Sequence, residues 1–142
     1  MITEPKLSVD EDGTQRWYLT GVRHRTDGPA EIYPNGTQLW YLNDQLHRED
    51  GPAVIYPDGE QCWYLTGVRH RTDGPAVVFA VGEHHWYLNG KLHRTDGPAV
   101  VFAVGEQRWY LNGKRYYFSD WLAALDADDK TKTLLTLKWS ST

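Results

Sequence analysis

The sequence is poor in several features that stabilise or target proteins, and cysteine comes first. One cysteine, Cys62, occurs in 142 residues, so neither an internal disulfide nor a cysteine-based zinc site supports the fold. The longest apolar run, residues 75–81, is far too short to cross a bilayer. The first residues are acidic, whereas a secretory signal begins basic and becomes apolar. These absences predict a cytoplasmic protein with no membrane span, held together by packing and hydrogen bonds.

An excess of positive charge is also lacking. Lys and Arg together number 15, Asp and Glu number 19, and the net charge is -4. Proteins that coat phosphates are usually basic, so general nucleic-acid binding is not expected. Abundant instead are Gly with 13 residues, Tyr with 9 and Trp with 7. Aromatic residues combined with turn formers predict β-structure before residue 116.

The chain repeats itself with a period of 23 residues. The triplet Trp-Tyr-Leu begins at positions 17, 40, 63, 86 and 109. The heptapeptide His-Arg-(Thr/Glu)-Asp-Gly-Pro-Ala begins at positions 24, 47, 70 and 93. A fixed period of this length is typical of repeat architectures. We therefore predict a repeat array over residues 1–115, opened by a degenerate strand at 7–9, and a different segment over 116–142.

Each unit has the pattern of a β-hairpin. An apolar run at 53–56 precedes Pro57-Asp58-Gly59, and a second run follows at 61–65. Proline suits the first position of the turn, and glycine suits the position with left-handed backbone conformation. This turn fixes the register of the two strands, so that Glu31 faces Leu39 in the preceding unit. A second bend falls at Thr-Gly, Asn-Asp or Asn-Gly pairs, which tolerate positive φ. Two reversals per unit predict a mostly β fold, an antiparallel β-hairpin meander or solenoid.

Alternation along the strands divides the side chains between two faces. One face carries Ala, Ile or Val, Trp and Leu in every unit, and we predict that it is the core. The opposite face carries aromatic rings beside positions that vary between units. Because this variation indicates a side not fully committed to packing, we predict that it binds a partner. The candidate partner-binding residues are Tyr18, Tyr41, Tyr64, Tyr87, Tyr110, Tyr33, Tyr56, Phe79, Phe102, Arg16, His85 and Arg108.

The C-terminal segment predicts two short helices. Residues 118–125 have Ser119 as an N-cap candidate, and residues 130–139 place leucines among Lys and Thr. Atypical terminal segments commonly cover the end of a solenoid. We expect a helical cap, and the alternative is that Trp121 and Trp139 belong to a docking surface.

The unit at residues 51–74 resembles a MORN-type repeat. Tyr56-Pro57-Asp58-Gly59 and Asn89-Gly90-Lys91-Leu92-His93 correspond to two landmarks of that family. The glycine usual in the second strand is absent and the Arg-x-Asp-Gly-Pro-Ala element is unusual, so the chain looks like a divergent subgroup, similar to proteins of bacteria, bacteriophages and large viruses. The resemblance implies an elongated hairpin stack used for protein association, without catalytic residues. It further implies a phage-type inhibitor or adaptor of a host protein in the host cytoplasm.

Recurring polar residues offer other candidate sites, each with a structural explanation. The His-Arg-x-Asp ladder could hold metal, but each Arg would repel a cation, and we expect the Asp to pair with Arg or to cap the glycine bend. Cys62 has no recurring base beside it, so we predict a surface thiol rather than a nucleophile. Catalysis needs a constellation unlike its surroundings, and these residues recur by period. We therefore predict no enzyme, no metal and no cofactor.

Three hypotheses about function remain. The first is a repeat protein that binds one protein partner, including a second copy of itself as a homodimer, through the aromatic face. The second is a nucleotide or small-anion binder that pairs phosphate with Arg16, Arg108 or the ladder arginines at 25, 48, 71 and 94. The third is a structural scaffold without a specific ligand.

Overall fold

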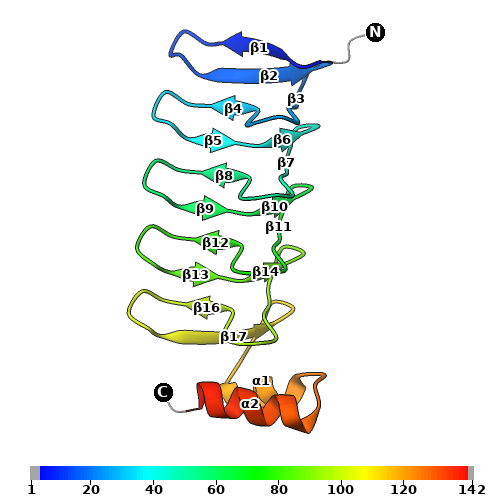
Figure 1. Cartoon of the computed structure of the whole chain (residues 1–142), viewed down its shortest axis with the longest axis vertical. Coiled ribbons are helices and arrows are strands. Elements are labelled where there is room, and N and C mark those ends of the chain that lie inside the picture. The colour runs from blue at the N-terminus through cyan, green and yellow to red at the C-terminus, as the bar shows by residue number, and fades with distance from the viewer. Residues whose placement is uncertain (1–3, 141–142) are drawn as a thin grey trace.

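The computed structural model describes residues 4–140 and shows a stack of β-hairpins closed at one end by two helices (Figure 1). One antiparallel sheet of twelve strands runs the length of the stack, which confirms the predicted hairpin array. In sheet order its strands are β1 (Lys6–Val9), β2 (Gln15–Leu19), β4 (Glu31–Ile32), β5 (Gln38–Leu39), β8 (Val54–Ile55), β9 (Gln61–Cys62), β12 (Val77–Val78), β13 (His84–His85), β16 (Val100–Val101), β17 (Gln107–Leu111) and β18 (Lys114–Tyr116), while β3 (Val22–Arg23) pairs with β2.

Turn chemistry sets the register of this sheet as the sequence predicts. Glu31 lies opposite Leu39, and the Tyr33 N–H donates to the Thr37 carbonyl oxygen at 3.0 Å to close the loop. Gly36 has a φ of 92°, a conformation that glycine adopts without steric cost. The second bends also have positive φ at their first residue. Those residues are Thr20, Asn43, Thr66, Asn89 and Asn112.

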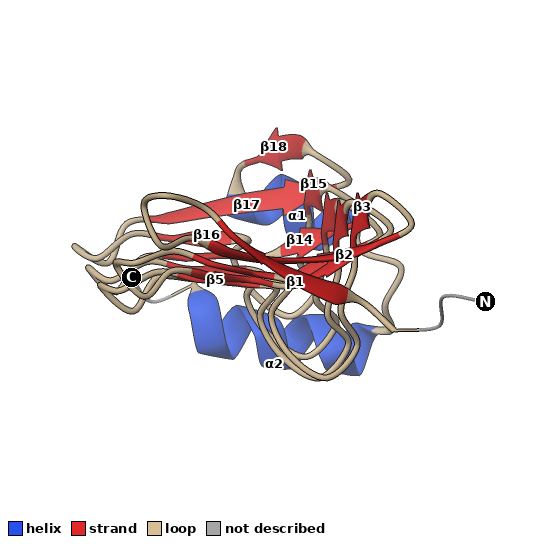
Figure 2. Cartoon of the chain, turned by 90° about the horizontal axis from the view of Figure 1, so that it is seen from above, coloured by secondary structure: helices blue, strands red, loops and turns tan. Residues whose placement is uncertain are grey.

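Each middle unit carries a second, smaller hairpin that the sequence does not separate from the first. The strand expected over residues 61–65 breaks at Trp63, although the Trp63 N–H still donates to the Ala76 carbonyl oxygen at 2.7 Å. Figure 2 shows β15 and β3 rising from one face of the sheet, while connecting loops project from the opposite face. The small hairpins are β6 (Tyr41–Leu42) with β7 (Gln45–Leu46), β10 (Tyr64–Leu65) with β11 (Val68–Arg69), and β14 (Tyr87–Leu88) with β15 (Lys91–Leu92).

These small hairpins bury more of the variable face than expected of a side not fully committed to packing. Val54 and Val77 are 3% and 2% exposed, and they form a core cluster with Cys62, which is 5% exposed. Leu46 on β7 packs against this cluster and covers it. The prediction of a surface thiol at Cys62 is therefore wrong, because in the middle units the chain bends at the Trp and returns over the face that the hairpin alone would leave open.

The face that the sequence assigns to the core is buried in part. Its alanines, one per unit, are fully buried, as the close approach of a neighbouring indole requires. Trp109 is 7% exposed, whereas the four earlier tryptophans of the repeat are half-buried. Arginine side chains cover the outer surface of those four indoles. The pairs are Arg25 over Trp17, Arg48 over Trp40, Arg71 over Trp63 and Arg94 over Trp86.

Two helices, α1 (Phe118–Ala124) and α2 (Asp129–Trp139), cover the last unit. Trp121 is fully buried against Trp109, with ring centroids 4.5 Å apart, and its Nε1–H donates to the Arg94 carbonyl oxygen. The Trp139 Nε1–H donates to the Asp96 carbonyl oxygen at 3.1 Å. Both indoles therefore serve the cap rather than an open docking surface.

The helix starts differ from the sequence prediction. Tyr117 is the N-cap of α1 and makes no side-chain capping bond, so Ser119 lies within the helix rather than at its start. Asp128 is the N-cap of α2, and its carboxylate accepts from the Thr131 N–H at 2.8 Å. Neither helix, nor any other in residues 4–140, is long and apolar enough to span a membrane.

Candidate partner-binding surface

The ladder of His-Arg-x-Asp elements is internally bonded. In the second unit, the Arg48 Nε–H donates to Asp50 at 2.9 Å and its Nη1–H donates to the Pro52 carbonyl oxygen at 3.1 Å. The guanidinium also lies 4.0 Å from the centroid of the Trp40 ring. The same three contacts recur at Arg25, Arg71 and Arg94. This confirms the expected Arg–Asp pairing and makes the ladder a structural device.

The histidines of the ladder connect consecutive units. Each Nδ1 accepts a hydrogen bond from a backbone N–H nineteen residues later, at 2.9 to 3.1 Å. An accepting Nδ1 fixes the tautomer that carries its proton on Nε2. Among residues 4–140, no three His, Cys, Asp or Glu side chains are grouped so that they could hold a metal ion.

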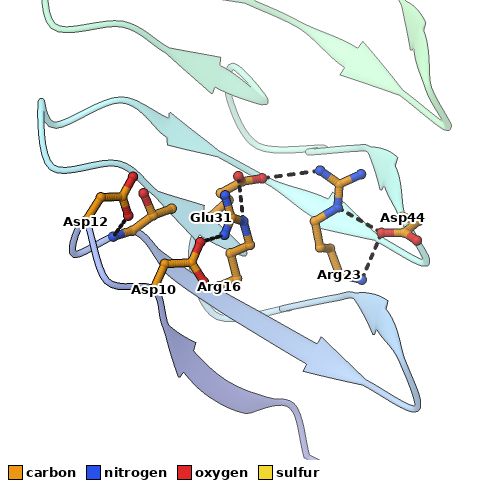
Figure 3. A network of polar contacts seen from close by, with 7 residues as sticks. Asp10, Asp12, Arg16, Arg23, Glu31 and Asp44 are labelled. Atoms are coloured by element: carbon orange, nitrogen blue, oxygen red, sulfur yellow. Dashed lines mark hydrogen bonds and ion pairs between the residues drawn. The ribbon is translucent and has the colours of Figure 1, made fainter.

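A buried carboxylate marks the first unit (Figure 3). Glu31 is 2% exposed and accepts from Arg16 Nε at 2.9 Å and from Arg23 Nη1 at 3.2 Å. Arg16 also pairs with Asp10, and Arg23 donates to Asp44 at 2.9 Å. Each arginine therefore pairs with two carboxylates, Glu31 and one other. The two guanidinium groups neutralise the buried charge of Glu31.

The network replaces apolar packing found in later units. Burial pushes the pKa of Glu31 upward, but hydrogen bonds from Tyr33, Arg16 and Arg23 outweigh it and hold that pKa below its ordinary value. Valine occupies the equivalent position in the next three units and is buried in each. Arg16, a candidate partner-binding residue, is half-buried and is therefore engaged in ion pairs within the chain.

The other candidate residues differ widely in accessibility. Tyr18 and Tyr56 are exposed, at 36% and 41%. Tyr64, Phe79 and Tyr87 are half-buried and pack against the valine core. The remaining rings of the set are half-buried as well, namely Tyr33, Tyr41, Phe102 and Tyr110.

The two remaining candidates, His85 and Arg108, contact acids two residues earlier in the chain. The His85 ring contacts Glu83, and Arg108 Nε donates to Glu106 at 3.2 Å while its guanidinium lies 4.6 Å from the Phe102 centroid. The hairpin loops therefore carry carboxylates at a recurring position, which sequence reasoning missed. The sequence signal that could have revealed these carboxylates is the Glu that directly follows the hairpin loop in three units.

The structure gathers Tyr33 and Tyr56 from consecutive hairpin loops around an open groove. The groove has a volume of about 710 Å³. Asp58 and Glu60 contribute carboxylates to its wall, and no Lys or Arg is among the described residues that line it. Aromatic rings and acids together form a surface suited to a cation. The further lining residues are Asn35, Thr37 and Pro57.

Comparison with protein-family models and with curated protein sequences finds no match to this chain.

Proposed function

We propose that this chain is a non-enzymatic binding protein that holds a protein partner at its hairpin loops. The groove between Tyr33 and Tyr56 lies at the centre of the contact. The observation that carries this proposal is the composition of the groove, two aromatic rings with the carboxylates of Asp58 and Glu60. Aromatic residues exposed on a rigid scaffold are the residue type that dominates interface energetics. Such a surface needs no catalytic group.

The chemistry of the groove selects a basic side chain of the partner. A guanidinium can stack on a tyrosine ring and donate to a carboxylate at the same time. The protein itself uses this combination, since Arg25 lies 3.9 Å from the Trp17 centroid and donates to Asp27 at 2.8 Å. A partner surface that presents arginine would repeat the arrangement across the interface.

The anion-binding alternative receives less support. The ladder arginines already bond a carboxylate and a carbonyl oxygen, so phosphate would have to displace both. The groove at Tyr33 and Tyr56 is lined by acids, which repel a nucleotide phosphate.

The resemblance to MORN-type repeats adds that the partner is a host protein, which this chain inhibits or recruits in the cytoplasm.

The proposal is tested with a library of Arg-containing peptides and the same library carrying citrulline in place of arginine. Citrulline keeps the shape of the side chain but removes its charge. We expect the immobilised protein to retain Arg peptides and not their citrulline versions. Tyr56→Ala and Asp58→Lys should abolish retention, while Tyr117→Ala, at a ring that is 83% exposed outside the groove, should leave it unchanged. Equal retention of both libraries, or a nucleotide that co-purifies with the protein, would overturn the proposal.

A further inference from the structure

The two ends of the sheet are finished differently. At one end the helices α1 and α2 pack on the last unit, whereas β1 forms the other end with no described strand beyond it (Figure 1). All four residues of β1 are exposed, and Leu7 and Val9 are 52% and 58% exposed. A regular strand with an open edge is a template for pairing with another strand.

The backbone of β1 shows which groups face outward. The Asp10 N–H donates to the Thr14 carbonyl oxygen at 2.9 Å, toward β2. Because the direction alternates along an antiparallel strand, Lys6 and Ser8 also face β2, and Leu7 and Val9 direct their N–H and C=O groups to the open edge. The β2 side agrees, since Trp17, opposite Leu7, donates away from β1 to Ala30 at 2.8 Å.

We propose that β1 pairs with β1 of a second copy of this chain, antiparallel about a two-fold axis at Ser8. In this register Leu7 lies opposite Val9 of the second copy, so the two outward-facing residues exchange their N–H and C=O groups. Both side chains lie on the same face of the sheet and form an apolar pair. Lys6 then lies opposite Asp10 of the second copy, which pairs opposite charges twice across the axis.

Neighbouring registers fit less well. An axis at Leu7 would place Pro5, which has no N–H, against Val9 and would bring Glu4 against Asp10. An axis at Val9 would place Leu7 against Glu11, an acid. A register shifted by half a residue would set an outward-facing group against an inward-facing one, which makes no hydrogen bond. The self-complementarity of this short sequence, rather than its open edge alone, identifies a second copy as the occupant.

The proposed contact joins two stacks end to end into one continuous sheet. It buries only the edges of two short strands, less than stable protein interfaces usually bury, so the dimer should be weak and dependent on concentration. It does not rest on the proposed function, because β1 contributes no residue to the groove between Tyr33 and Tyr56.

The test is sedimentation equilibrium of the full chain over a wide concentration range. Wild type should pass from monomer to dimer, and Lys6→Glu should shift the midpoint at least tenfold higher because it places like charges opposite each other. Asp10→Lys should do the same. A mixture of the two variants should regain association, because each altered residue then faces an opposite charge. Lys130→Glu, at an exposed residue of α2, makes the same charge change away from β1 and should associate as wild type does.

Circular dichroism and thermal melts show whether each variant keeps its fold. Asp10→Lys also removes a contact with Arg16 and could destabilise the fold. If it does, the comparison of Lys6→Glu with wild type alone tests the proposed dimer. A wild-type chain that stays monomeric at every concentration would overturn the proposal. So would a Lys6→Glu variant that associates as strongly as wild type.

Discussion

The Nδ1 atom of His47 accepts a hydrogen bond from the backbone N–H of Thr66, 2.9 Å away in the next unit of the stack. Thr66 has a φ of 48°, in the left-handed region that β-branched residues rarely adopt. The bond satisfies the N–H of this bend and joins it to the unit before. Because the same bond recurs in every full unit, the ladder histidines align successive turns along the array.

Replacing His47 by Ala should lower the free energy of unfolding by about 1 kcal/mol, the usual net contribution of one such bond. His47→Asn places an acceptor oxygen at the same branch position as Nδ1 and should recover part of the loss. Urea denaturation of both variants measures the difference. Equal stability of the Ala and Asn variants would show that packing, and not the hydrogen bond, explains the role of His47.

The buried network around Glu31 predicts a contrast between one substitution and three. Glu31→Val alone leaves Arg16 and Arg23 without their buried partner and should cost roughly 1–3 kcal/mol. In a triple variant, Arg16 and Arg23 become leucine and Glu31 becomes valine, which are the residues at these positions in the next unit. This variant should restore stability or raise it by about 1–4 kcal/mol. Chemical denaturation of the two variants checks both values. A triple variant less stable than Glu31→Val would contradict this account.

Acid should weaken two Arg–Asp pairs of the ladder, Arg71 with Asp73 and Arg25 with Asp27. The hydrogen bond from Arg71 lowers the pKa of Asp73, and Arg25 does the same for the pKa of Asp27. A carboxyl with a lower pKa when folded stabilises the fold above its unfolded pKa of about 3.9, and this stability is lost as pH falls through the folded pKa. Urea midpoints measured from neutral pH downward should therefore drop below about pH 4.

Neutral variants identify which carboxyls are responsible for that drop. Asp73→Asn removes the titrating group and should flatten the acid limb of the stability curve. Asp126→Asn, at an exposed carboxyl outside the array, should leave the curve as steep as in wild type. The reverse result would place the acid sensitivity in the connection between α1 and α2.

The buried thiol of Cys62 should resist modification. Burial raises the pKa of Cys62 to about 11 from an ordinary value of 9.0, and only the thiolate reacts with thiol reagents. A disulfide reagent should therefore react far more slowly with folded protein than with protein in urea. Since the unfolded thiol ionises first, stability should also decline as pH rises between these two values. Equal reaction rates with and without urea would mean that the thiol is open to solvent.

Two predicted binding residues show where sequence reasoning about the site is incomplete. Arg16 occupies a position of the variable face where the residue type changes from unit to unit, and the structure binds it to Glu31, a partner fifteen residues away. Tyr56 is exposed and lines the groove. The groove that it forms with Tyr33 depends on the spacing of consecutive hairpins and on the carboxylates beside these hairpins. No single unit contains this arrangement.

The sequence by itself determined the period, the positive-φ turns and the hairpin register, because each depends on residues close together in the chain. Strand alternation also separates two sets of side chains, but it does not say which set becomes buried. Only the tertiary structure decided that question: in the middle units the chain bends at the Trp, and residues such as Leu46 return over Val54 and Cys62. Burial follows from what covers a face, and that covering comes from another segment of the unit.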